Sequence, residues 1–198
     1  MMEIIMQIGL IAFQLFAMLN PPSCIPIFLA ATEGDERKKR ARMARAATLL
    51  TFVLMAVFAL IGGHLLTALD VSLEAMKFGG GILLLALSLS TVLGLDDELS
   101  RADGEGAIVP IVTPLLVGPG TLTLLTVISA YNPPHILLPS VAIASLSAYA
   151  CFRGADLLAR ALGSTGIKAL ARLMAVLVAA MAAEMIHSAL LAWGIAES

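Results

Sequence analysis

The sequence predicts an all-α membrane protein with six transmembrane helices, arranged as two inverted three-helix repeats whose first and fourth helices break near the bilayer midplane. Hydrophobic residues make up 60% of the 198 residues and charged residues only 13%, which is more apolar surface than one soluble core buries. Six apolar segments approach the roughly 20 residues that cross the hydrocarbon of a bilayer. Two of these segments are interrupted by prolines at corresponding places.

The six segments are expected at 4–31, 46–66, 73–93, 107–130, 136–158 and 167–193. All lysines and arginines except Lys77 lie in or near the connections after the first, third and fifth segments. Because Lys and Arg set orientation, these connections are predicted to be cytoplasmic and both termini to lie outside. The single transmembrane domain then divides into a first repeat at 1–95, an acidic cytoplasmic linker at 96–106 and a second repeat at 107–198. Three spans in each repeat place the second repeat upside down relative to the first.

The first segment is broken by the run Asn20-Pro21-Pro22-Ser23. Proline lacks a backbone N–H and clashes with the preceding turn, so a helix stops here and restarts. In a bilayer the freed backbone groups find no water, and broken helix persists only where it is packed in protein or lines a cavity. We expect Pro22 to suit the first position of the restarted helix. Asn20, the unwound carbonyls and Ser23 are expected to hold an ammonium group or a cation.

The fourth segment contains the second break, with two prolines and two glycines near its middle. A helix that restarts here presents N–H groups without partners and the positive end of its dipole, which favours a carboxylate. No basic residue lies at either break, so the predicted ligand is a small zwitterion. Two simple proline kinks, which transmembrane helices tolerate, are the alternative interpretation. The candidate binding residues of the second break are Thr113, Pro114, Gly118, Pro119, Gly120, Thr121 and Thr123.

Glu184 lies in the sixth segment between Arg172 and Trp193, well inside the predicted hydrocarbon. A carboxylate at that depth costs about 2.5–3.5 kcal/mol on insertion scales. Two interpretations stand side by side: a proton-coupling acid, and a buried group that is hydrogen-bonded for structure. His187 follows at i+3 on the same helix face. A Glu-x-x-His metal site would need further carboxylates, and no other segment supplies an acid at depth, so no metal is predicted.

Other patterns exclude several classes of protein. The chain has no Gly-x4-Gly-Lys-Ser/Thr, His-Glu-x-x-His or Gly-x-Ser-x-Gly motif, so neither direct ATP drive nor enzymatic activity is predicted. No cofactor and no nucleic-acid partner are expected, and nothing in the sequence assigns an oligomeric state. Cys24 and Cys151 are expected to be small buried hydrophobic residues. The run 79–81 of three glycines is expected to let helices approach closely.

These residues together resemble the MarC family of integral membrane proteins, over essentially the whole chain. The matching pieces are Asn20-Pro21, 25–29, Thr32, 78–84, 107–110, 114–121 and 172–174. The resemblance implies a six-span protein of the cytoplasmic (inner) membrane, with some relatives described as transporters of small neutral amino acids. The chain departs from the family pattern at Pro22-Ser23, where relatives tend to carry glycine two positions after Asn-Pro, and at Glu184, where they tend to carry glutamine.

The predicted function is secondary active transport of a small neutral amino acid of the glycine, alanine and serine class, coupled to H⁺ or Na⁺. The partners are then the lipid bilayer, a zwitterionic substrate and a coupling cation. Two alternatives stay open: an exporter or channel for another small solute or ion, and a membrane protein that transports nothing.

Overall fold

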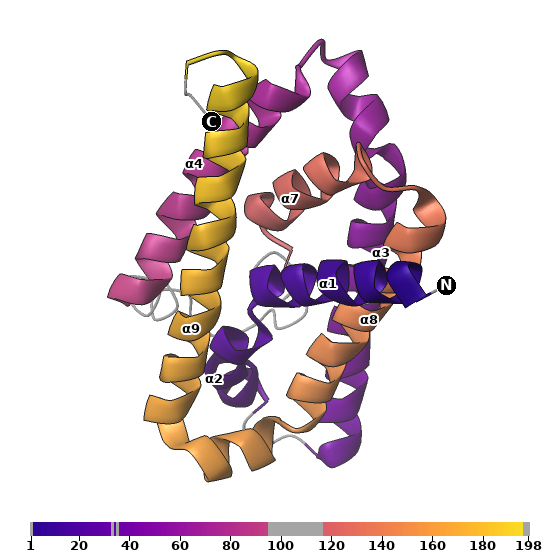
Figure 1. Ribbon diagram of the computed structural model, residues 1–198. Coiled ribbons are helices and arrows are strands. Elements are labelled where there is room, and N and C mark those ends of the chain that lie inside the picture. Colours follow the sequence, from indigo (N-terminus) through magenta and orange to yellow (C-terminus); the bar gives the residue numbers. More distant parts are fainter. Residues whose placement is uncertain (1, 33, 35, 95–116, 196–198) are drawn as a thin grey trace.

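The computed structural model describes residues 2–32, 34, 36–94 and 117–195, and these are helical with short connections and no strand (Figure 1). Thr113, Pro114 and the linker 96–106 lie outside the described residues. The described helices are α1 (Met2–Leu19), α2 (Pro21–Ala31), α3 (Arg37–Ala68), α4 (Leu73–Leu93), α7 (Pro119–Ser129), α8 (Pro134–Arg153) and α9 (Ala155–Ala192).

Five of the described helices, α1, α3, α4, α8 and α9, are long and apolar enough to cross a membrane. The helices α2 and α7 are apolar but only 11 residues each. At 1.5 Å per residue such a helix is about 16 Å long, roughly half the thickness of the hydrocarbon layer. The predicted all-helical membrane protein is therefore confirmed, and each short helix begins at one of the two predicted breaks.

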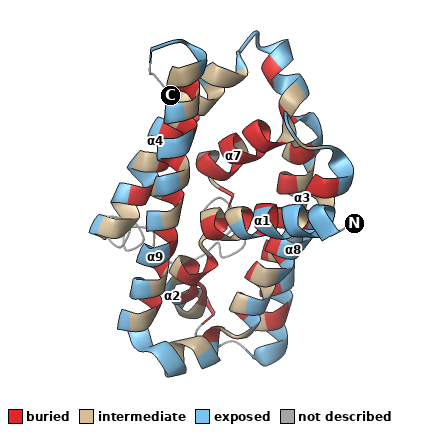
Figure 2. Ribbon diagram, in the orientation of Figure 1, coloured by how far each residue is buried: buried red, intermediate tan, exposed pale blue. Residues whose placement is uncertain are grey.

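The four longest helices run along the length of the molecule, while α1 crosses them and α2 and α7 lie within the bundle (Figure 1). The helix α4 packs along α9, and α3 packs along α8. The helix α7 packs on α3 and α4, and α2 packs on α9 and α8. Buried residues gather on α2, on α7 and on the facing sides of the longer helices (Figure 2). The two short helices therefore form the centre of the core.

Close approach between helices depends on the glycines of α4. A Cβ atom added at Gly81 would lie 2.6 Å from Ile186 Cγ1 and 2.9 Å from the backbone oxygen of Ala182 on α9. One added at Gly80 would overlap the Cγ2 methyl of Thr123 on α7. Gly79 has no atom within 4 Å of such a Cβ. Two of the three glycines thus allow the predicted close packing, and the third faces away from it.

The boundary between the fifth and sixth segments differs from the prediction. The sequence predicted one apolar segment to 158 and the next from 167, but α8 ends at Arg153 and α9 begins at Ala155. Only Gly154 connects them, and a kink with φ 64° and ψ 178° at Gly163 interrupts α9 instead. Apolar residues after Gly154 made residues 155–158 look like a continuation of the fifth span. They belong to a separate helical segment, 155–162, that precedes the kink.

Candidate functional site

The first break is a single left-handed residue between α1 and α2. Asn20 has φ 43° and ψ 54°, a conformation that asparagine tolerates better than most residues. Its Nδ2 donates a hydrogen bond to the backbone oxygen of Ala171 on α9, at 3.3 Å. Its Oδ1 is buried and has no hydrogen-bond partner. An unsatisfied buried acceptor costs about 1–3 kcal/mol, so Asn20 offers a place for a donor or a cation.

The helix α2 starts one residue earlier than predicted, with Pro21 first and Pro22 second. The two prolines remove two of the N–H groups that a helix N-terminus normally offers. The backbone N–H and the hydroxyl of Ser23 both donate to the Asn20 carbonyl, at 3.0 and 2.8 Å. The first break therefore presents mainly acceptors, which suits an ammonium group or a cation better than a carboxylate.

The second break begins α7, with Gly118 as the N-cap residue and Pro119 as the first helical residue. Gly120 is buried, and a Cβ there would overlap Met18 Cε and lie 2.6 Å from Leu84 Cδ2. Because Met18 stands two residues before Asn20, the end of α1 and the start of α7 are neighbours. The glycine at this position therefore lets the side chains of Met18 and Leu84 pack directly against the first turn of α7.

The two threonines of α7 among the predicted ligands are both buried. Thr123 packs its methyl group against Gly80 of α4, so its side chain contributes to the helix contact. Thr121 is 1% exposed and lies one residue after Gly120. Of the predicted residues of the second break that the structure describes, Gly118, Pro119, Gly120 and Thr121 form the start of α7.

Glu184 is exposed to a cavity of about 590 Å³ between α1, α7 and α9. Gln14 of α1 and Tyr131, which follows α7, bring further polar groups into a lining that is otherwise apolar. The Nζ of Lys77 lies 4.8 Å from the centroid of the Tyr131 ring. His187 does not line the cavity. The described residues contain no group of three His, Cys, Asp or Glu side chains that would hold a metal ion.

The sequence interpretation missed Gln14 and Tyr131. Gln14 had a usable signal, since it is a polar side chain inside the first apolar segment, as Glu184 is inside the sixth. It also missed three hydroxyls on the paired helices α3 and α8, those of Thr48, Thr51 and Ser145, which are buried without a hydrogen-bond partner. Their residue types alone gave no signal, because helix hydroxyls ordinarily bond to their own backbone.

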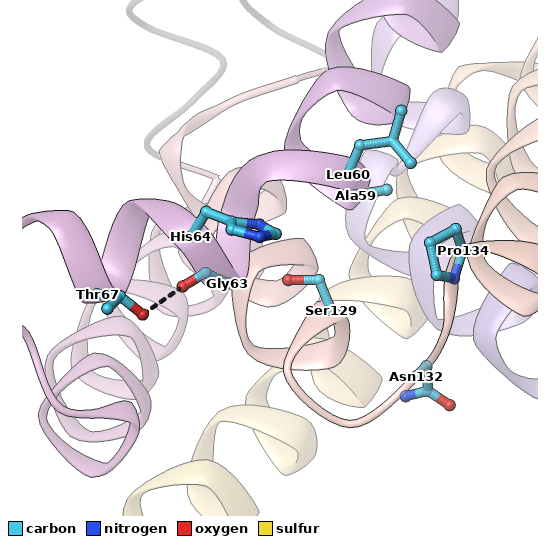
Figure 3. A pocket seen from close by; sticks show the side chains of 8 residues that line it. All are labelled: Ala59, Leu60, Gly63, His64, Thr67, Ser129, Asn132 and Pro134. Atoms are coloured by element: carbon cyan, nitrogen blue, oxygen red, sulfur yellow. Dashed lines mark hydrogen bonds between the residues drawn. The ribbon is translucent and has the colours of Figure 1, made fainter.

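A second pocket of about 270 Å³ lies between α3, α7 and the connection to α8. His64 and Ser129 face each other across it (Figure 3). Three of its polar groups already donate to backbone carbonyls: Thr67 Oγ1 at 3.3 Å, Ser129 Oγ at 2.8 Å and Asn132 Nδ2 at 3.0 Å. With its donors already used, this pocket is a weaker candidate than the cavity at Glu184.

The helices and the buried breaks define an all-helical integral membrane protein. The chain belongs to the MarC family, because the family model described as "MarC family integral membrane protein" matches residues 5–193. It is 30% identical to a UPF0056 membrane protein of Methanocaldococcus jannaschii over 194 residues, covering 91% of this chain and 95% of the relative.

Two bacterial relatives give the same result. The chain is 29% identical to the UPF0056 membrane protein YvbG of Bacillus subtilis over 191 residues, covering 89% of this chain and 90% of the relative. It is 28% identical to the UPF0056 membrane protein YhcE of Escherichia coli over 185 residues, covering 87% and 86%. No solved structure matches the chain significantly. The family is therefore established as one of membrane proteins, and the names of these relatives specify no substrate.

Proposed function

We propose that this protein is a secondary active transporter of small neutral amino acids of the glycine, alanine and serine class, driven by a gradient of H⁺ or Na⁺ across the cytoplasmic membrane. The observation that carries the proposal is a matched pair of short apolar helices, one beginning at each predicted break. Each break is followed by an apolar helix of 11 residues that begins with proline. Interrupted helices in corresponding places of two halves are a pointer to the binding site of a transporter.

The same pairing supports two inverted repeats. If α2, α3 and α4 correspond to α7, α8 and α9, the packing of α2 on α9 and α8 has its counterpart in the packing of α7 on α4 and α3. Under that exchange the pairs α3–α8 and α4–α9 map onto themselves, as helices next to a two-fold axis would. Six spans with both termini outside complete this proposal, because the basic connections then face the cytoplasm.

In the proposed site the two breaks bind opposite ends of the substrate. The unpaired Oδ1 of Asn20 and nearby carbonyls would accept hydrogen bonds from the ammonium group or contact a coupling cation. The first turn of α7, beginning at Pro119 and Gly120, would bind the carboxylate through backbone N–H groups and the helix dipole. Glu184, in the cavity next to α7, would exchange a proton during the cycle.

Transport is tested with purified protein in vesicles that hold an imposed H⁺ or Na⁺ gradient. We expect uptake of labelled glycine, alanine or serine that collapses when an ionophore dissipates the gradient. If none of the small neutral amino acids showed gradient-dependent uptake, the proposal would be wrong. An ion flux that is unaffected by added amino acids would instead favour an exporter or channel for another solute or ion.

The role of Glu184 is tested by Glu184→Gln, which keeps the shape and removes the exchangeable proton. If Glu184 couples transport to protons, this variant changes the pH dependence of uptake and reduces accumulation against a gradient. His187→Gln is the matched control, since it removes a titratable group one turn away that does not line the cavity. An unchanged pH profile in Glu184→Gln would leave the carboxylate with a structural role only.

A further inference from the structure

Exposed basic side chains of the helices α3, α8 and α9 lie at one end of the molecule. The exposed basic side chains of this surface, called the basic end below, are Arg37, Lys38, Arg42, Arg45, Arg153 and Arg160. No ion pair within the described part of the chain engages any of these six. Both α3 and α9 begin here, at the lower end of the molecule in Figure 1. Among the described residues at this end, the cations outnumber the acids, which are Glu36 and Asp156.

The length of α3 gives the depth of these cations. Its 32 residues make a helix of about 48 Å, whereas the hydrocarbon layer is about 30 Å thick. The apolar part of α3 starts at residue 46, directly after Arg45. The preceding turns, from Arg37 to Arg45, therefore extend about 14 Å beyond the apolar boundary, through the layer where lipid headgroups lie.

The first segment of α9, residues 155–162, adds apolar side chains at the same level. The kink at Gly163 separates this segment from the rest of α9, and it runs across the lower end of the bundle (Figure 1). Leu157 is 72% exposed and Leu162 44% exposed, while Arg160 lies between them. Exposed leucines interspersed with a cation, on a segment across the end of a membrane bundle, are typical of an interfacial helix.

This segment is held in place by contacts with α3. The guanidinium of Arg40 donates from Nη1 to both carboxylate oxygens of Asp156, at 2.8 and 2.7 Å. Its Nη2 donates to the Thr32 carbonyl at the end of α2, at 3.0 Å. Arg40 thereby pairs with the acid at the start of α9, and the six cations of the basic end take no part in that ion pair.

We infer that the basic end is a binding surface for the anionic headgroups of phospholipids, with Leu157 and Leu162 inserted at the boundary of the acyl chains. Charge complementarity favours this partner, since juxtamembrane Lys and Arg each strengthen binding to an anionic leaflet about five-fold. Continuity favours it as well, because the surface begins where the apolar part of α3 ends. The inference does not depend on the proposed transport.

Binding is tested on the full chain in a neutral detergent, by fluorescence anisotropy of labelled phosphatidylglycerol and of phosphatidylcholine with the same acyl chains. The wild-type protein is expected to bind phosphatidylglycerol at least ten-fold more tightly at low salt, and to lose most of this preference at high salt. The triple variant Arg37→Gln/Lys38→Gln/Arg42→Gln is expected to reduce phosphatidylglycerol affinity by ten-fold or more and to leave phosphatidylcholine unaffected.

Two further variants separate charge from apolar contact. Lys77→Gln removes a cation near the start of α4, which lies away from the basic end. It is expected to leave the lipid preference unchanged. Leu157→Ser is expected to weaken both lipids by a similar factor, because it removes an apolar contact that does not distinguish headgroups. The inference would be overturned if Lys77→Gln weakened phosphatidylglycerol binding as much as the triple variant does per charge removed, since net charge alone would then explain the preference.

Three other results would overturn the inference. The first is a wild-type protein that binds both lipids equally, and the second is a triple variant that keeps the preference. The third is a preference that emerges only after Asp96, Asp97 and Glu98 of the acidic linker are changed to their amides, since the linker would then occupy the basic end. Competition by millimolar inorganic phosphate, beyond that of chloride at equal ionic strength, would assign the surface to free phosphate instead.

Discussion

Replacing Gly81 by alanine tests whether close packing between α4 and α9 stabilises the protein. The added Cβ would lie 2.6 Å from Ile186 Cγ1, 2.9 Å from the Ala182 oxygen and 3.3 Å from the Ile186 nitrogen. Two of these three atoms belong to the backbone, so a rotamer change cannot relieve the overlap and the helices have to separate. Overpacking of this kind costs about 1–3 kcal/mol. Alanine recovers at most about 0.5–1 kcal/mol of backbone entropy, less in a membrane where the dissociated helices stay helical.

The net expectation is a loss of about 1–2 kcal/mol in the free energy of unfolding. For a chain of this size, each kcal/mol lost lowers Tm by roughly 2–4 °C, which thermal unfolding in detergent can measure. Gly79→Ala is the matched control, because its Cβ meets no atom within 4 Å. We expect it to be neutral or stabilising by up to about 1 kcal/mol. If Gly81→Ala were as stable as Gly79→Ala, the helices would not be packed through this glycine.

Three further experiments test the first break, the packing of α2, and the contact between α3 and α9. Asn20→Gly and Asn20→Ala both remove the candidate ligand, but only alanine is strained at φ 43°, so it should be less stable than glycine by about 1–2 kcal/mol in thermal unfolding; equal stability would contradict the left-handed break. A maleimide should label Cys151, which is half-buried, well before Cys24, which is 1% exposed; mass spectrometry of Cys24→Ala and Cys151→Ala assigns the labelled thiol, and rapid labelling at Cys24 would contradict the packing of α2. Asp156→Asn should lower the free energy of unfolding by less than about 1 kcal/mol, because it breaks only a partly exposed ion pair. Arg40→Gln should lower it more, because Arg40 also donates a hydrogen bond to the Thr32 carbonyl at the end of α2. The reverse order in denaturant titrations would exclude this second role of Arg40.

Much of the helical framework could be predicted from the sequence because the relevant forces are local. Apolar length predicted α4 at its observed bounds, 73–93, and prolines predicted the starts of α2 and α7 to within about two residues. The junction between α8 and α9 was predicted wrongly because Leu157 and Leu158 were assigned to the fifth apolar run, although Arg153 and Asp156 flank Gly154. Charges beside a glycine indicate where an apolar run ends, but not the direction of the helix that follows. The direction of α1, which crosses the long helices, likewise depends on packing against distant segments.

The candidate site was predictable in its parts and not in its assembly. The depth of Glu184 follows from its position in an apolar run, but its cavity also needs Gln14 of α1 and Tyr131 after α7, which only tertiary packing brings near it. Thr123 shows the opposite case. Its position after the break suggested a ligand, yet the glycine at position 80 gives its methyl group a packing site on α4. A residue type near a break indicates a possible contact, and the neighbouring helix decides which contact forms.

The helices that follow the two breaks have the same length but differ in the polar groups at their starts, which bears on what the proposed site would bind. Two prolines deprive α2 of donors at its start, and the unpaired Asn20 Oδ1 adds an acceptor. The start of α7 has one proline followed by Gly120, so a donor remains in its first turn. Two chemically equal breaks would favour a ligand with like ends. An acceptor break close to a donor break instead favours a ligand with one positive and one negative end, and an amino acid zwitterion is the smallest common metabolite with that pattern.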